Sequence, residues 1–170
     1  MTLLTMYQSS INGRYIDTLV DALRNGELIV YPTDTTYAVG CDALNNRAIE
    51  RICKIKGIDP RKQHLSIVCS DISQASEYAR IDNRAFSLLK SSLPGPFTFI
   101  LPTATTLPKV FKGRREVGVR VPDNEIARTL ARELGNPLLT TNVDWPDAGD
   151  DITLPHAVAD HYGPLGVAFT

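Results

Sequence analysis

The sequence lacks the motifs that mark the common nucleotide, metal and hydrolase sites. It contains no GxxxxGKS or GxxxxGKT P-loop, no GxGxxG fingerprint, no HExxH or CxxC pair and no GxSxG elbow. Its three histidines, His64, His156 and His161, are too scattered along the chain to predict a metal site. Any nucleotide site in this protein must therefore follow a different scheme.

Long apolar stretches and cysteine frameworks are also missing. No run approaches the ~20 apolar residues that cross a membrane, and the N-terminal residues lack the basic start and apolar stretch of a signal peptide. The cysteines, Cys41, Cys53 and Cys69, have spacings of 12 and 16 residues, which match neither a disulfide framework nor a zinc site. These absences predict a cytoplasmic protein with no membrane contact.

No lysine or arginine follows Arg132, whereas six acidic residues do. Because those six account for −6 of a net charge of −1, residues 1–132 carry +5. A basic surface of this kind could attract phosphates, or it could be an ordinary solvated face. Two clusters supply much of the charge: Arg51, Lys54, Lys56, Arg61 and Lys62, and Lys109, Lys112, Arg114, Arg115 and Arg120.

Helical and strand patterns alternate along the chain, which predicts a single α/β domain over residues 1–170. Runs of adjacent apolar residues, such as ELIVY, indicate strands covered on both faces. We therefore expect a twisted, mixed β-sheet flanked by helices, with ligands bound in the loops 32–41, 56–64, 120–124 and 141–150. The expected helices cover 13–25, 46–55, 71–78, 83–93, 124–134 and 155–162, and the expected strands 28–31, 65–69, 97–101, 117–121 and 138–141.

One polar segment directly follows the first expected strand. Residues 31–41 read YPTDTTYAVGC, which places five hydrogen-bonding side chains in succession from Thr33 to Tyr37. Asp34 and Thr35 are good helix-capping residues, so the segment could begin a helix. Its hydroxyls and backbone amides could instead hold a zwitterionic ligand. The residues alone leave both alternatives open.

Two further segments carry isolated basic side chains. In IKGIDPRKQHLS, residues 55–66, Lys56 lies beside a turn and could bind phosphate or stabilise a helix end. In VGVRVP, residues 117–122, Arg120 interrupts an apolar strand, so we expect its charge to meet a carboxylate of the protein or of a ligand. The segment LPGPFTFIL, residues 93–101, predicts only a rigid turn that enters a buried strand.

Taken together and in this order, the segments resemble the YrdC/YciO family. The strings PTDTTYAVG, KGIDPRK, PGPFTFIL, VGVRVP and LLTTNVD are similar to family strings of the forms PTDTxYGLG, KGR, PGPxTxIL, VGxRVP and TSAN. The resemblance spans about residues 15–145 and is closest to the YciO branch. It implies a YrdC/RibB-like fold, in which a twisted α/β sheet surrounds a concave, positively charged cavity.

The resemblance also implies a reaction and its partners. The family joins L-threonine, bicarbonate and ATP, with Mg²⁺, into threonylcarbamoyl-AMP for tRNA modification, and its members are also described as binding double-stranded RNA. By motif, Arg120 would bind the threonine carboxylate and Lys56 the ATP phosphates. No catalytic acid or base and no metal ligand stands out. The other implied contacts are Thr33, Thr36 and Tyr37 in the threonine pocket, and Arg61, Thr140 and Asn142 near the nucleotide.

Three departures from the family pattern bear on catalysis. Ile58 replaces the arginine of the basic turn, which Arg61 could supply from three residues further along. An ungapped count places Asn142 and Asp144 at the family's serine and asparagine, whereas a shift of two residues matches Thr140 and Asn142. The family usually continues through a further strand and loop, so a short chain or a reduced pocket is expected. The departures leave three functions open. The first is a threonylcarbamoyl-AMP synthase, or a close variant that uses another amino acid, and the second is a non-catalytic, translation-associated protein that binds double-stranded RNA. The third is a nucleotide-binding regulator with no turnover.

Overall fold

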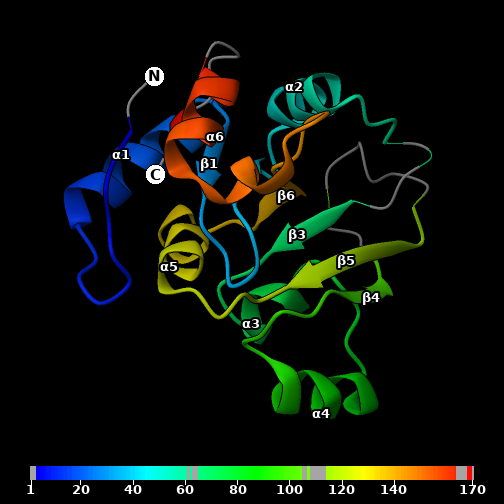
Figure 1. Ribbon diagram of the computed structural model, residues 1–170. Helices are drawn as coiled ribbons and strands as arrows, with labels where there is room; N and C mark the ends of the chain where they lie inside the picture. The colour runs from blue at the N-terminus through cyan, green and yellow to red at the C-terminus, as the bar shows by residue number, and fades with distance from the viewer. Residues whose placement is uncertain are drawn as a thin grey trace.

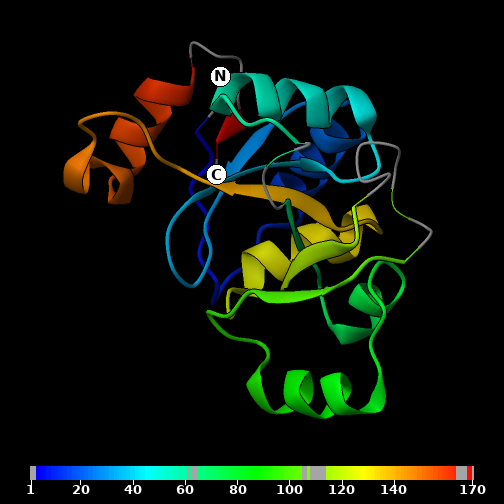
Figure 2. The ribbon, with the colours of Figure 1, turned by 90° about the vertical axis from the view of Figure 1, so that its right-hand side faces the viewer.

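The computed structural model contains one seven-stranded mixed β-sheet with helices on both faces (Figures 1 and 2). It describes residues 3–60, 62, 65–104, 107, 114–163 and, for the backbone alone, 168–169. The strand order is β4-β5-β3-β6-β2-β1-β7; the β3–β5 and β1–β7 pairs are parallel and the others antiparallel. This confirms the predicted fold class. The strands are β1 Ile29–Tyr31, β2 Ala38–Asp42, β3 Ser66–Val68, β4 Phe99–Pro102, β5 Glu116–Arg120, β6 Leu138–Asn142 and β7 Ala168–Phe169.

Capping residues mark many of the helix ends. Two of them end at left-handed glycines, Gly57 with φ 64° and Gly135 with φ 78°. Within the described ranges, no helix is long and apolar enough to cross a bilayer. The side-chain caps are Asn12, Asn45, Asp71, Asp82 and Asn124. The helices are α1 Gly13–Arg24, α2 Asn46–Lys56, α3 Ile72–Ser76, α4 Asn83–Ser92, α5 Glu125–Leu134, α6 Pro155–Tyr162 and the 3₁₀ helix Gly149–Thr153.

Two hydrophobic layers hold helices on opposite faces of the sheet, because side chains alternate along each strand. α1 and α5 lie side by side (Figure 1) and pack on the face that carries Val68 and Leu138. α2 packs on the face that carries Val39 and Ile67. Since Arg120 is the cross-strand partner of Val68, its side chain shares the face of α1 and α5. The fold thus places Arg120 on the same face of the sheet as α1 and α5, next to the loop that leads from β5 into α5.

The structure corrects two local predictions. Residues 32–41 are not one loop, because Ala38–Asp42 form β2, which is antiparallel to β1 and β6 and buried throughout. Only residues 32–37 connect the strands, so Asp34 caps no helix. The strand after residue 97 is also not buried as expected: β4 is an edge strand, and Ile100 is 49% exposed. An apolar run alone could not show that its strand lies at the edge.

Candidate functional site

The loop between β1 and β2 is held in shape by its own threonines. The Thr33 hydroxyl donates a hydrogen bond to the Thr36 carbonyl at 2.6 Å and accepts one from the Thr35 backbone N–H at 3.1 Å. The Thr33 and Thr35 hydroxyl oxygens also lie 3.1 Å apart. Local bonds of this kind fix a loop without a helix to cap. Thr33, which the resemblance places in the ligand pocket, therefore has its hydroxyl engaged within the loop.

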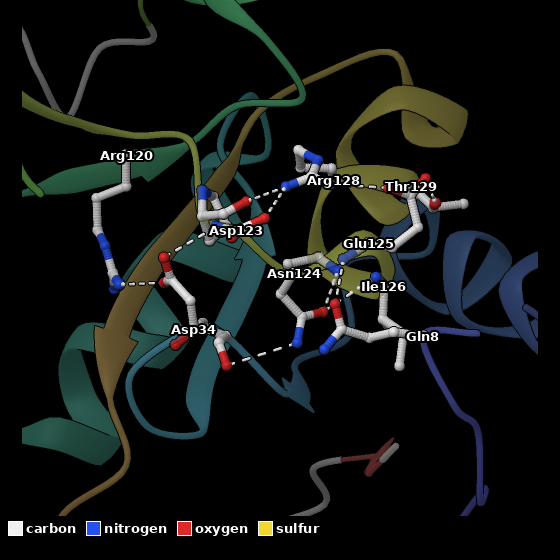
Figure 3. Close-up of polar contacts among 12 residues, drawn as sticks. Gln8, Asp34, Arg120, Asp123, Asn124, Glu125, Ile126, Arg128 and Thr129 are labelled. Carbon is white, nitrogen blue, oxygen red and sulfur yellow. Dashed lines mark hydrogen bonds and ion pairs between the residues drawn. The ribbon is translucent and has the colours of Figure 1, made fainter. Parts of the chain in front are cut away.

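Arg120, at the end of β5, reaches the same loop (Figure 3). Its Nη2 donates to the Thr35 hydroxyl at 3.2 Å and lies 3.7 Å from Asp34 Oδ1. Only 8% of Arg120 is exposed. The buried charge is thus met by a carboxylate of the protein, which is one of the two alternatives expected from the sequence. Asp34 was named from the sequence only as a possible helix cap, so its pairing with Arg120 was not predicted.

Tyr37 ends the loop and is partly buried against the core. Its carbonyl accepts a hydrogen bond from the Val143 backbone N–H at 3.1 Å. Together with residues 3–8 and His156, it lines a cavity of about 440 Å³. The loop therefore borders this cavity as well as contacting Arg120.

Lys56, at the C-terminal end of α2, contacts the segment after β6. Its ammonium donates to the Asp144 carbonyl at 3.0 Å and to the Tyr162 hydroxyl at 3.3 Å. The Tyr162 hydroxyl in turn donates to the Asp144 carbonyl at 3.1 Å. With Trp145 and His161, these residues line a pocket of about 180 Å³. The predicted phosphate-binding lysine therefore borders a small cavity, which it shares with the segment after β6.

Thr140 and Asn142 lie two residues apart on β6 and differ in exposure. Thr140 is 9% exposed, and its hydroxyl accepts a hydrogen bond from the Tyr31 hydroxyl at 2.9 Å. Burial raises the pKa of Tyr31, so the phenol stays protonated and keeps this bond. Asn142 is exposed at the end of the strand, opposite Ala38. Of the two predicted nucleotide contacts, Asn142 is the one open to a ligand.

Among the described residues of the basic turn after α2, the position of the family's arginine carries no charge. Arg61 lies outside the described residues, so its role stays a prediction. Ile58 packs against the hydrophobic core and supplies no charge. The Asp144 side chain is exposed, and it is the backbone of this residue that contacts Lys56 and Tyr162. Over the described ranges, the Lys56 ammonium is therefore held by a carbonyl and a phenol, with no carboxylate.

The surroundings of His161 predict that the stability of the protein depends on pH. Its ring stacks on Trp145, with centroids 4.3 Å apart and planes at 11°. Burial, and then the charge of Lys56, lower the pKa of His161. Folding thus favours the neutral imidazole, whose contribution is present above its ordinary pKa of about 6.5 and is lost as the pH falls below it. We expect this residue to lower the melting temperature slightly from about pH 7 to pH 5.

Thermal unfolding of His161→Gln and His156→Gln over that pH range tests this expectation. His156 lies exposed on the same helix, α6, and serves as the matched control. The fall in melting temperature should become shallower in His161→Gln and remain as in the wild type in His156→Gln. An identical pH response in both variants would contradict the assignment.

The strand order and the buried arginine facing a loop of hydroxyls define an α/β protein of YrdC-like fold. More particularly, the chain belongs to the Sua5/YciO/YrdC family, because the family model described as "Telomere recombination" matches residues 21–163. The resemblance seen in the sequence is thereby confirmed.

Relatives of the chain include YciO and threonylcarbamoyl-AMP synthases. YciO of Escherichia coli strain K12 is 38% identical over 149 residues, which are 86% of this chain and 72% of YciO. Its crystal structure superposes with a TM-score of 0.83 at 35% identity, covering 94% of this chain and 79% of that chain. The threonylcarbamoyl-AMP synthase of Vibrio vulnificus strain YJ016 is 32% identical over 130 residues, 74% of this chain and 69% of the synthase. P. abyssi Sua5 complexed with L-threonine superposes with a TM-score of 0.80 at 30% identity, covering 94% of this chain and 47% of Sua5.

Proposed function

We propose that this protein binds L-threonine and ATP and forms threonylcarbamoyl-AMP from them and bicarbonate, for the threonylcarbamoyladenosine of tRNA. The observation that carries the proposal is the buried Arg120 beside the hydroxyl-rich loop 32–37. It occurs in a chain that superposes over 94% of its length on the Sua5 structure complexed with L-threonine. The products balance as threonylcarbamoyl-AMP, pyrophosphate and water.

Arg120 would bind the carboxylate of the amino acid. A guanidinium has five N–H donors, and within the described part of the chain Arg120 uses one of them in a hydrogen bond, to Thr35. Donors therefore remain for a two-pronged contact with a carboxylate. Thr33, Thr36 and Tyr37 would shape the pocket through the conformation of the loop.

Lys56 would hold phosphate groups of ATP. An ammonium has three donors, and the contacts with Asp144 and Tyr162 leave one of them for a ligand. The adjoining pocket of about 180 Å³ suits a phosphate group rather than a whole nucleotide. Arg61 and Asn142 would contribute further contacts along the nucleotide, whereas Thr140 is buried and its hydroxyl is bound by Tyr31. Mg²⁺ would neutralise charge on the triphosphate when it is bound.

This chemistry needs positioning and charge stabilisation more than proton transfer by a side chain. The two cations lie at different places: Arg120 ends a strand, and Lys56 ends a helix. No hydrogen bond or ion pair joins them among the described residues, so they can act on different parts of the reactants. Arg120 would orient the amino acid and Lys56 the phosphates, which brings the reacting groups together.

A second candidate is non-catalytic binding of double-stranded RNA. Ile58 favours it, because a side chain packed on the core replaces the arginine expected to hold phosphate. Arg47 and Lys54 are exposed on α2 and could contact an RNA backbone. Such a protein needs no amino-acid pocket, so threonine dependence distinguishes the two functions.

The proposal predicts that Lys56→Ala and Arg120→Ala each lower product formation by about 100-fold or more, the usual effect of removing one charge-stabilising group. The protein is incubated with ATP, Mg²⁺, bicarbonate and L-threonine, and pyrophosphate and the new adenylate are followed by chromatography. Lys54→Ala is the matched control, because Lys54 is exposed two residues before Lys56 on the same helix.

Threonine-dependent product in the wild type and in Lys54→Ala, and its loss in the other two variants, would support the enzyme. No product from the wild type, together with salt-sensitive retention of double-stranded RNA in a shift assay, would overturn it and favour the RNA-binding candidate.

A further inference from the structure

We infer that Asp34 is a positioning residue that holds the Arg120 guanidinium ready for the carboxylate of the amino acid. The inference rests on the proposed function, since it takes Arg120 to be the carboxylate ligand. It assigns a role to a loop carboxylate that would otherwise be a structural partner only.

The distance shows that Asp34 neutralises Arg120 without occupying its donors. Arg120 Nη2 and Asp34 Oδ1 are 3.7 Å apart, which is within ion-pair range but longer than the roughly 3.2 Å limit of an N–H···O bond. Asp34 Oδ1 is buried and has no hydrogen-bond partner among the residues that the structure describes. The guanidinium therefore keeps its N–H groups for other acceptors while its charge is balanced.

Because Arg120 is buried, its charge needs the counter-ion that Asp34 provides. The Arg120 side chain is 9% exposed and the Asp34 side chain 10% exposed. A buried cation with no counter-ion is costly, so an unneutralised arginine would turn toward water. With Asp34 in place, Arg120 stays inside the protein, and a ligand carboxylate meets a guanidinium that is already oriented.

A second contact anchors Asp34 itself (Figure 3). Its Oδ2 accepts the Asp123 backbone N–H at 2.9 Å. The Asn124 side-chain amide lies 3.5 Å from the Thr33 carbonyl, and Asn124 is also the N-cap of α5. The loop 32–37 is thus tied to the segment that follows Arg120 in the chain. Asp34 therefore contacts both Arg120 and the segment that follows it, which fixes the carboxylate beside the guanidinium.

The matched comparison is Asp34→Asn against Asp123→Asn. Asparagine keeps the shape of aspartate and can accept the Asp123 N–H, but it cannot neutralise Arg120. Asp123 belongs to the same segment, yet its side chain is 70% exposed and pairs with Arg128 at 3.4 Å. Binding of L-threonine, measured by calorimetry without nucleotide, should weaken about tenfold in Asp34→Asn and stay within about twofold in Asp123→Asn.

Steady-state kinetics separates positioning from general damage to the fold. The KM for L-threonine should rise by about the same factor as the dissociation constant, with kcat and the KM for ATP within about twofold of the wild type. Asp34→Glu retains the charge and should bind L-threonine more tightly than Asp34→Asn. A merely structural role would instead lower kcat and alter both KM values together.

The outcomes distinguish this inference from the proposed function. If Asp34→Asn binds L-threonine as the wild type does while Arg120→Lys binds it weakly, the positioning role is overturned and the proposed function stands. Equal weakening in Asp34→Asn and Asp123→Asn would also overturn the role, because it would reflect disturbance of the segment. If the wild type does not bind L-threonine, the proposed function fails and the inference fails with it.

Discussion

Arg120→Met should lower the free energy of unfolding by about 3–5 kcal/mol, because it leaves Asp34 as a buried charge with no counter-ion. Methionine keeps a long, unbranched and adaptable side chain, so the loss of charge outweighs the change in volume. The Asp34 side chain is only 10% exposed, and water cannot readily replace the arginine. Urea unfolding followed by circular dichroism measures the effect.

The double variant Arg120→Met/Asp34→Asn tests the physical reason. It should be more stable than Arg120→Met alone, because no unpaired charge remains in the interior. Arg132→Met serves as the surface control: the Arg132 side chain is 53% exposed and pairs with Glu125 at 3.5 Å, so its loss should cost about 1 kcal/mol or less. If the double variant shows the sum of the two single losses, the charges are not coupled.

Gly40→Ala should lower the free energy of unfolding by about 1–3 kcal/mol through overpacking. A Cβ atom there would lie 2.6 Å from Tyr31 Cε1 and 3.2 Å from the Leu139 carbonyl oxygen. The Tyr31 ring is fully buried, and its hydroxyl bonds to Thr140 at 2.9 Å. The ring cannot swing away without losing that bond, so the strain falls on the centre of the sheet.

Gly13→Ala is the control for this substitution. Gly13 begins α1, and nothing lies within 4 Å of a Cβ built there. Alanine should be neutral there, or should stabilise the helix by up to about 1 kcal/mol. Chemical unfolding of Gly40→Ala and Gly13→Ala in parallel measures how much each substitution changes the free energy of unfolding. A Gly40→Ala protein as stable as Gly13→Ala would show that Tyr31 does not restrict this position.

Local signals were sufficient for the α-helices, but not for the 3₁₀ helix Gly149–Thr153 or for every strand. The capping asparagine at 124 and the glycine at 135 bound α5 in the sequence and in the structure, because a helix end is decided by a few neighbouring residues. β2 was missed because the polar run 33–37 precedes it and its five residues are all buried, without alternation. Its identity as a strand depends on pairing with β1 and β6.

For the candidate site too, the sequence indicated some of the residues but not the partners that they contact. Arg120 could be recognised from the sequence because a charge inside an apolar strand is costly wherever the strand lies. Its partners could not, since Thr35 is 85 residues away along the chain. Likewise Lys56 stood out beside its turn, whereas the Tyr162 hydroxyl that contacts it comes from a helix 106 residues further on. Nothing near Tyr162 in the sequence marks that contact.

Periodicity, caps and motif strings, which are properties of adjacent residues, already establish the α/β class, the family and the two cations. The tertiary structure alone decides that Arg120 is neutralised by Asp34 and that Lys56 is held by Tyr162 and the Asp144 carbonyl. The physical reason is that these contacts arise from the order of strands in the sheet and from the path of the loop 32–37. Both result from the packing of the whole chain rather than from any one segment of it.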